Sequence, residues 1–157
     1  MKRPWNLSNL PVYSLATYDG GRVNMNICTY VSAVSMTPKR YMVAVYHNTQ
    51  SILNTQKSNT AVLQLLSQQH LPLVNVLGKK SGKRYDKHSY LIKKKLVGTW
   101  EGMPVLSNCA AWVKLEKLWA KEAGDHTMYL FDVVAFKTNH EDVLTLDHLR
   151  EKKLIRN

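Results

Sequence analysis

Segments with the residue pattern of β-strands follow one another along most of this chain. They are rich in β-branched and aromatic residues, and turn-forming residues separate several of them. Helical periodicity is confined to short stretches between them. Such a chain must bury its apolar side chains against paired strands. The predicted strands are residues 11–19, 23–36, 41–47, 60–66, 109–121 and 126–137.

Turn residues set the expected pairing of the first strands. Asp19-Gly20-Gly21 predicts a hairpin between the first two strands, and Pro38 ends the second. Together with the third strand, these segments predict a meander. Residues 109–121 alternate poorly, and we interpret them as a long strand with a bulge in preference to a helix.

Short helices are predicted after the third strand and at the C-terminus. Thr49 or Asn48 is a suitable N-cap for the first helix. The second begins near Leu71, and Gly78 is its expected C′ residue. The predicted helices are residues 48–59, 71–78 and 145–155.

These elements predict a mainly β fold, a single antiparallel barrel that is closed or nearly closed, with two or three short helices. No repeat, low-complexity tract or linker divides the sequence, so residues 1–157 are expected to form one domain. At 157 residues, with 45% hydrophobic and 21% charged residues, the chain is long enough to bury a core.

The sequence offers no sign of export or of membrane insertion. No apolar run approaches the ~20 residues that span a bilayer. The basic start, MKRPWNLSN, lacks the apolar stretch of a signal peptide. Cys28 and Cys109 are too few for a disulfide framework or a four-thiolate zinc site. We therefore expect a cytoplasmic protein with no membrane partner.

Positive charge is concentrated in residues 79–95. The segment holds eight Lys or Arg and one Asp, a net +7, whereas the whole chain carries +11. It would attract nucleic acid or an anionic small molecule, although a solvated lysine-rich loop is the commoner explanation. It lacks the interleaved aromatic residues of a base-stacking platform, having only Tyr85 and Tyr90.

Several enzyme classes are excluded by missing motifs. The scattered glycines form no GxGxxG, and no Walker loop or GxSxG elbow occurs. The six histidines show no HExxH spacing, so no metal site is predicted. On a strand, Cys28 is more often a buried small side chain than a nucleophile.

Two polar stretches are suited to a flat, phosphate-bearing ligand. A helix beginning at residues 48–51 would offer free N–H groups and the positive end of its dipole. Short amides and hydroxyls between residues 24 and 35 would hydrogen-bond such a ligand along a strand. Taken alone, each also fits an ordinary helix cap or a half-buried strand.

Four segments, in order, resemble those of the flavin reductase-like, FMN-binding split-barrel family, which includes NAD(P)H:flavin reductases and flavoredoxins. The resemblance runs from about Val12 to Phe136. The segments are NMNICTYVSAVSMTP (24–38), HNTQSILNTQKSNTAVLQLLS (47–67), LVNVLGKKSGKRYDKHSYL (73–91) and GDHTMYLFDVVAF (124–136).

The resemblance implies a split barrel of Greek-key type that binds FMN and takes electrons from NADH or NADPH. Residues 24–32 would form the wall against the flavin, Lys87 would meet its phosphate, and His126 would line the nicotinamide side. The family pairs as homodimers, so a homodimer is expected. The implied cofactor-binding residues are Asn24, Asn26, Cys28, Thr29, Tyr30, Val31, Ser32, His47, Asn48, Thr49, Ser51 and Lys87.

Two alternatives stay open at this point. The first is an FMN-binding electron carrier without reductase turnover. The second is a basic β-barrel that binds nucleic acid through residues 79–95. Family departures lie at Tyr30, where Trp is frequent, at Val31, where a hydroxyl is common, and at His88, which replaces Phe.

Overall fold

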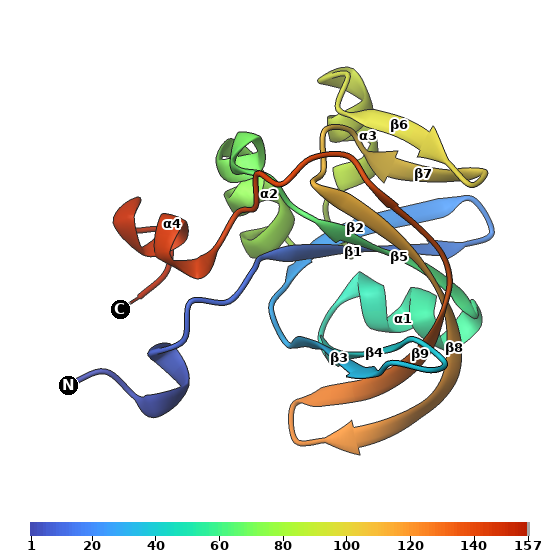
Figure 1. The fold of residues 1–157 in the computed structure, drawn as a ribbon. Helices are drawn as coiled ribbons and strands as arrows, with labels where there is room; N and C mark the ends of the chain where they lie inside the picture. The colour runs from blue at the N-terminus through green and yellow to red at the C-terminus, as the bar shows by residue number, and fades with distance from the viewer. Residues whose placement is uncertain (157) are drawn as a thin grey trace.

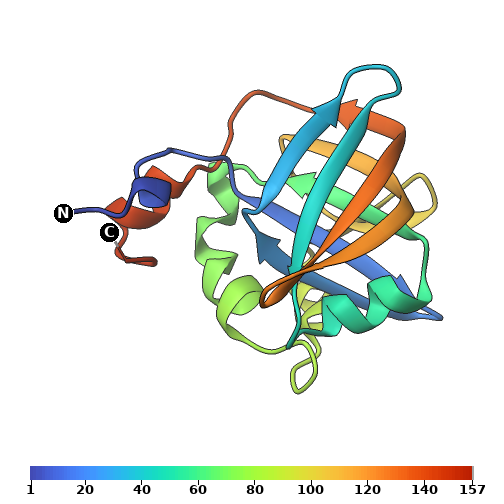
Figure 2. The same cartoon turned by 90° about the horizontal axis from the view of Figure 1, so that it is seen from below.

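A computed structural model describes residues 1–156, and its main element is a seven-stranded antiparallel sheet. The sheet curls into a barrel (Figures 1 and 2), with the strand order β2-β1-β5-β8-β9-β4-β3. Its edge strands β2 and β3 form no ladder with each other, so the barrel is split and the predicted fold class is confirmed. The strands are β1 (Tyr13–Asp19), β2 (Arg22–Cys28), β3 (Val31–Ser35), β4 (Arg40–Tyr46), β5 (Thr60–Leu65), β8 (Ala111–Ala123) and β9 (His126–Thr138).

The predicted strand 23–36 is wrong, because the chain changes partner in its middle. β2 pairs with β1 and β3 pairs with β4, and these pairs lie at opposite ends of the sheet. Thr29 and Tyr30 connect the two strands, and a single bond from Ala44 N to Tyr30 O (2.9 Å) spans the break. The predicted meander is therefore wrong as well. Residue alternation reports which face a strand buries, whereas its partner depends on how the barrel closes.

Both long hairpins follow the local sequence. The turn between β1 and β2 has Gly20 and Gly21 at φ 50° and 103°, as the Asp-Gly-Gly prediction requires. Between β8 and β9 the turn uses Gly124 at φ 70°. The predicted bulge in β8 is confirmed by register shifts at Lys114/Leu115 and Lys117/Trp119.

The helices are α1 (Gln50–Lys57), α2 (Val74–Lys79), α3 (Lys87–Lys93) and α4 (Leu146–Glu151), with 3₁₀ turns at Pro4–Asn6 and Gln68–Leu73. Helix α1 packs against β1, β2 and β4, α2 and α3 pack against β2, and α4 lies to the side of the barrel beside the N-terminal 3₁₀ turn (Figures 1 and 2). Thr49 caps the first helix, as predicted, and Gly78 lies inside the second instead of ending it, because the helix continues to Lys79. The described residues 1–156 form four α-helices, compared with the predicted two or three. Within residues 1–156, no helix is long and apolar enough to cross a membrane.

Two elements lie where the sequence predicted only loops. The basic segment contains α3, whose N-cap Asp86 accepts from Ser89 N at 2.9 Å. Residues 97–106 form a hairpin of β6 (Val97–Trp100) and β7 (Met103–Leu106), turning at Gly102 with φ 73°. Their short apolar stretches have no clear periodicity of their own and are stabilised by packing on the barrel.

Apolar side chains are buried on both faces of β1 and β5. One cluster lies inside the barrel and includes Leu15, Leu63 and Phe131. A second lies outside it, where side chains such as Leu77 and Leu106 cover the outer face of the sheet. β2 is an edge strand of the sheet, and α2 and α3 pack against it.

Candidate functional site

A hollow of about 340 Å³, here called the main pocket, opens along the edge strand β2. Its walls are the second half of β2 with Thr29 and Tyr30, the start of α1, residues 77–82 and His126. This volume lies in the range of small-molecule binding sites. The split in the barrel leaves this edge without a partner strand, which makes room for a ligand.

Most of the predicted site residues line the main pocket. They come from the β2 strand, the α1 start, α3 and the β9 start, segments far apart in the sequence. The fold alone brings them together. The predicted residues on its walls are Asn24, Asn26, Cys28, Thr29, Tyr30, Asn48, Thr49, Lys87 and His126.

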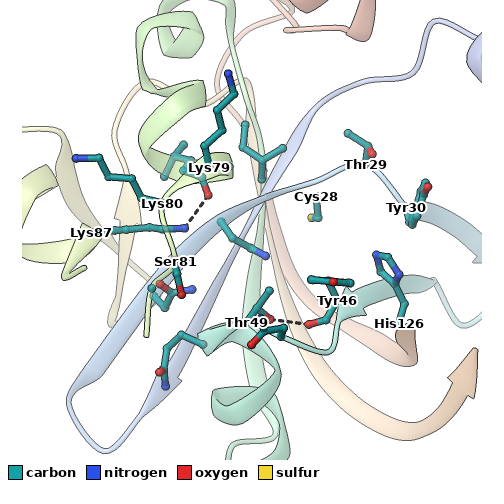
Figure 3. A pocket seen from close by; sticks show the side chains of 18 of the residues that line it. Cys28, Thr29, Tyr30, Tyr46, Thr49, Lys79, Lys80, Ser81, Lys87 and His126 are labelled. Carbon is teal, nitrogen blue, oxygen red and sulfur yellow. Dashed lines mark hydrogen bonds between the residues drawn. The ribbon is translucent and has the colours of Figure 1, made fainter. Parts of the chain in front are cut away.

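Lys80, Ser81 and Lys87 lie at one end of the main pocket, which we call the cation end (Figure 3). Lys87 is only 4% exposed, and its Nζ donates to the Leu77 carbonyl at 2.7 Å. Burial lowers the pKa of Lys87 from its ordinary 10.5 to about 8. A buried cation is costly, and an anion beside it would offset that cost.

The nearest acid in sequence does not neutralise Lys87. Asp86 directs its carboxylate to the amide and hydroxyl of Ser89, at 2.9 and 2.6 Å. Among the described residues, none of the ion pairs includes Lys87. The positive charge at this end is therefore available to a ligand.

The start of α1 contributes hydrogen-bonding groups to the same pocket. Thr49 Oγ1 accepts from Ile52 N at 3.2 Å and donates to the Tyr46 carbonyl at 2.7 Å (Figure 3). The other N–H groups of the first turn have no partner within the helix, as at any helix start. Asn48 Oδ1 accepts from Lys83 Nζ at 2.9 Å, which connects the α1 start to the turn after α2.

Gly82 is held tightly against Asn24. A Cβ on residue 82 would lie 2.2 Å from Asn24 Oδ1, far inside van der Waals contact. Asn24 is 3% exposed and donates from Nδ2 to Ser51 Oγ at 3.0 Å, so it cannot easily move away. A glycine is thus required at this position for the turn to approach β2 so closely.

Asn26 offers an unused acceptor in the pocket wall. Its Oδ1 is buried and has no hydrogen-bond partner among the described residues. Buried polar atoms are nearly always paired, so an orphan on a pocket wall is suited to a donor group of a ligand.

Cys28 lies on the same strand, and burial raises its thiol pKa to about 12. A thiol held protonated in this way is a poor nucleophile. Within residues 1–156, no group of three His, Cys, Asp or Glu side chains is placed to hold a metal ion.

Tyr30, Tyr46 and His126 form the opposite end of the main pocket, the aromatic end (Figure 3). The His126 ring is tilted against both tyrosines, with centroids 5.1 Å from Tyr30 and 5.4 Å from Tyr46. His126 Nδ1 lies 2.6 Å from Asp125 Oδ1, and this hydrogen bond lowers the pKa of Asp125. Tyr30 is 60% exposed, so this end is open to solvent.

Comparison with known families identifies the chain. A model described as "Flavin reductase like domain" matches residues 6–153. The chain belongs to this flavin reductase-like family. No curated protein matches its sequence.

Solved structures share the fold of this flavin reductase-like chain at low identity. An FMN-binding protein from Thermus thermophilus superposes with a TM-score of 0.77 at 20% identity, over 88% of this chain and 75% of that one. Flavoredoxin from Methanosarcina acetivorans gives 0.76 at 17%, over 88% and 75%. An NADH:FAD oxidoreductase from Streptomyces globisporus gives 0.73 at 15%, over 84% and 77%.

Four predicted site residues do not line the main pocket of this flavin reductase-like domain. Ser51 is fully buried beneath Asn24. His47 Nε2 lies 3.1 Å from both Thr127 Oγ1 and Glu122 Oε2. The remaining two, Val31 and Ser32, line a neighbouring hollow of about 460 Å³ that shares Tyr30 and His126 with the main pocket.

Several pocket residues are not predicted from the sequence, mainly those at the end of α2 and in the turn after it. The lysine density of residues 79–82 favours a charged surface, although these residues lie within one of the four segments that carry the family resemblance. The missed wall residues are Ile27, Ala44, Tyr46, Gln50, Leu77, Gly78, Lys79, Lys80, Ser81 and Gly82.

Proposed function

We propose that this chain binds FMN in the main pocket and passes electrons from a reduced nicotinamide to flavin. The observation that carries the proposal is the polarity of the pocket. A buried cation, Lys87, lies at one end, an orphaned acceptor, Asn26 Oδ1, lies in the wall, and an open aromatic end lies opposite. The cation is suited to a phosphate, the acceptor to a flat polar ring, and the open aromatic end to a second aromatic reactant.

The residues present fit FMN. Lys87 would meet the phosphate through a charge-assisted hydrogen bond. The first-turn amides of α1, which also border the pocket, would add neutral donors. Asn26 Oδ1 would accept from the imide N–H of the flavin ring. Gly82 keeps the turn low against Asn24, so that no side chain from residue 82 fills the space between β2 and the turn.

The chain's own contribution is to bind, orient and shield. When bound, FMN would supply the redox chemistry by accepting a hydride from the nicotinamide. No nucleophile is required, and the protonated thiol of Cys28 is consistent with that. His126, held by Asp125 and packed between two tyrosines, would present its ring to the nicotinamide at the aromatic end.

Either NADH or NADPH is proposed as the donor. The Streptomyces globisporus neighbour is named an NADH:FAD oxidoreductase, which supports reductase turnover. The Methanosarcina acetivorans neighbour is named a flavoredoxin, which supports the alternative of an electron carrier without turnover. Steady-state oxidation of NADH and of NADPH with added FMN distinguishes a reductase from a carrier. A carrier binds FMN but does not consume nicotinamide catalytically.

The primary test is a fluorescence titration with FMN and with riboflavin. FMN should bind at least tenfold more tightly, because only FMN carries the phosphate that meets Lys87. Equal affinity for the two flavins would contradict the proposed phosphate site at Lys87. No binding of either flavin would contradict the whole proposal.

A homodimer is proposed as the working form. Support comes from exposed apolar side chains around the pocket mouth and on the outer barrel, among them Tyr30, Met36 and Phe136, at 60, 87 and 75% exposure. Light scattering of the FMN-loaded protein should report twice the 18.0 kDa chain mass. A species of single-chain mass with FMN fully bound would contradict it.

The basic segment is a weak candidate for nucleic-acid binding. Tyr85 and Tyr90 pack against each other with centroids 6.2 Å apart. Lys80 lies 4.1 Å over Tyr85 and Lys94 lies 5.9 Å from the ring centre of Tyr90. Neither ring is left as a free platform for a base, which favours the small-molecule proposal.

A further inference from the structure

His70 does not line the main pocket, yet it is only 3% exposed and both of its ring nitrogens are engaged. Its Nδ1 lies 3.0 Å from the backbone nitrogen of Ser67, and its Nε2 lies 2.8 Å from the carbonyl oxygen of Ser107. Ser67 is the N-cap of the 3₁₀ turn Gln68–Leu73. His70 and Ser67 therefore form a capping box at the start of that turn, with histidine in the place usually taken by Glu or Gln.

The two contacts fix the protonation state of the His70 ring. A backbone N–H only donates, so Nδ1 must be unprotonated to accept from Ser67. A carbonyl oxygen only accepts, so Nε2 carries the proton and donates to Ser107. The imidazole is therefore neutral, and a second proton on Nδ1 would point at the N–H of Ser67 and break the capping box. Burial opposes the same step, because it lowers the pKa of His70.

Two titratable side chains of the segment after β9, His140 and Asp142, act on His70. Asp142 raises the pKa of His70 and His140 lowers it, and both effects are smaller than that of burial. The Asp142 carboxylate already accepts from the backbone N–H and the side-chain amide of Gln68, at 3.2 and 2.7 Å. His140 Nε2 lies 3.2 Å from the Asn108 carbonyl oxygen. These surroundings favour the neutral form of His70.

The turn that His70 caps leads directly into a wall of the main pocket. Helix α2 follows the turn without a break. Leu77 of α2 is fully buried, and its carbonyl accepts from Lys87 Nζ at 2.7 Å. Residues 77–82 continue along the pocket to the cation end. Loosening the start of the turn would therefore loosen the group that holds Lys87.

We propose that His70 is a positioning residue for the cation end and makes flavin binding sensitive to acid. Neutral His70 fixes the start of the 3₁₀ turn, the turn fixes α2, and α2 holds Lys87. Protonation of His70 breaks the capping box and frees this wall, so FMN affinity falls only at pH values below 6.5, the ordinary pKa of histidine. The proposal rests on the proposed function, because the site that it regulates is the FMN site.

A second histidine capping box provides a matched control. At the start of α4, the backbone nitrogen of Thr145 donates to His148 Nδ1 at 3.0 Å, so this box also needs an unprotonated Nδ1. Helix α4 does not line the main pocket. His148 therefore has the same capping chemistry as His70 but lies on an element that does not border the proposed FMN site.

The test compares FMN affinity in the wild type, His70→Gln, His70→Ala and His148→Gln by flavin fluorescence. Gln accepts from the N-cap amide in an ordinary capping box and does not titrate, whereas Ala removes the box. At pH 7, His70→Ala should weaken FMN about fivefold, and His70→Gln should stay within about twofold of the wild type. Between pH 7 and 5, the wild type and His148→Gln should lose about threefold or more affinity relative to His70→Gln. Titration of the phosphate itself affects all variants equally.

Thermal melts without flavin give a readout that does not depend on the FMN site. Unfolding lets His70 bind a proton that the folded chain excludes, so acid favours the unfolded state. Between pH 7 and 5, the melting temperature of the wild type should fall about 3 °C or more beyond that of His70→Gln.

Each contrary outcome has a distinct meaning. Equal FMN affinity of His70→Ala and His70→Gln at every pH would overturn the positioning role. An extra acid loss in the wild-type melt without an extra loss of FMN affinity would overturn it too, because the box would then serve only the fold. An acid effect removed as fully by His140→Gln would assign the titration to His140 instead. No FMN binding by the wild type at any pH would contradict the proposed function itself.

Discussion

The two ends of the main pocket differ in origin and in exposure. The cation end is built by segments added to the barrel, the turn after α2 and the start of α3, and its key group, Lys87, is 4% exposed. The aromatic end is built by the barrel strands themselves, where β4 ends and β9 begins, and Tyr30 there is 60% exposed. A fixed, desolvated charge is suited to holding a cofactor. An open aromatic surface is suited to a reactant that must come and go.

The largest effect should come from the buried charge at the cation end. Lys87→Ala should weaken FMN about ten- to a hundredfold, since a charge-assisted hydrogen bond contributes roughly 1.5–3 kcal/mol. Riboflavin, which has no phosphate, should lose much less. Both affinities are measured by flavin fluorescence.

Lys94→Ala is the matched control, because it removes one charge from the same segment. An exposed lysine should cost less than ~0.5 kcal/mol. If Lys87→Ala and Lys94→Ala weaken FMN binding by the same small factor, and added salt abolishes this loss relative to the wild type, then Lys87 is not a phosphate ligand.

The second effect concerns the shape of the cation end. Gly82→Ala would place a Cβ 2.2 Å from Asn24 Oδ1, so the turn must shift away from β2. We expect a loss of roughly 1–3 kcal/mol of stability, as for overpacking, and about tenfold weaker FMN binding. Thermal melts and titrations check both.

Gly78→Ala is the control for Gly82. Both glycines line the main pocket, but a Cβ at residue 78 would meet only Ile27, at ordinary contact distances of 3.6–3.7 Å. An equal effect of the two substitutions would show that the close approach of residue 82 to Asn24 has no special role.

The third effect is a pH dependence limited to the cation end. Free Lys87 has a pKa of about 8, and a bound phosphate would raise that pKa. Above pH 8 the complex therefore holds a proton that the free protein has lost, so FMN affinity falls as pH rises, by at most about tenfold per unit. Titrations between pH 7 and 9.5 should show this fall for FMN and not for riboflavin. If the fall in FMN affinity persists in Lys87→Ala, then another titrating group causes it.

The smallest effect on FMN is expected at the aromatic end. His126→Ala should change FMN affinity less than about threefold, because His126 lies at the opposite end of the main pocket from Lys87, the proposed partner of the phosphate (Figure 3). It should raise the KM for the nicotinamide several-fold, since the ring that faces the donor is lost; contacts of this kind are worth about 1 kcal/mol. A large loss of FMN affinity with unchanged KM would reverse the roles of the two ends.

The sequence predicts features that depend on neighbouring residues. The Asp19-Gly20-Gly21 turn and the cap at Thr49 follow from backbone freedom and from one side-chain hydrogen bond. The strand starting at His126 follows from its own alternation. Such features involve few residues, so long-range packing rarely overrides them.

Features that depend on distant partners are not encoded by the local sequence. The family resemblance implies Ser51 and His47 as cofactor-binding residues, and in the structure their side chains contact Asn24 and Glu122. The lysine-rich sequence of residues 79–95 predicts no helix, yet residues 87–93 form α3, which buries Lys87 and Leu91. Only packing decides which side of a polar segment faces inward.

The sequence by itself determined that this chain is a mainly antiparallel β protein with little helix, and which residue types line its edge strand. Tertiary structure decided that the chain breaks its strand at Thr29 and Tyr30 and carries β3 to the far end of the sheet. It also decided that Lys87, alone among the lysines of its segment, is buried. Hydrogen-bond pairing across a barrel and desolvation of a charge both depend on atoms far apart in sequence, so no local pattern encodes them.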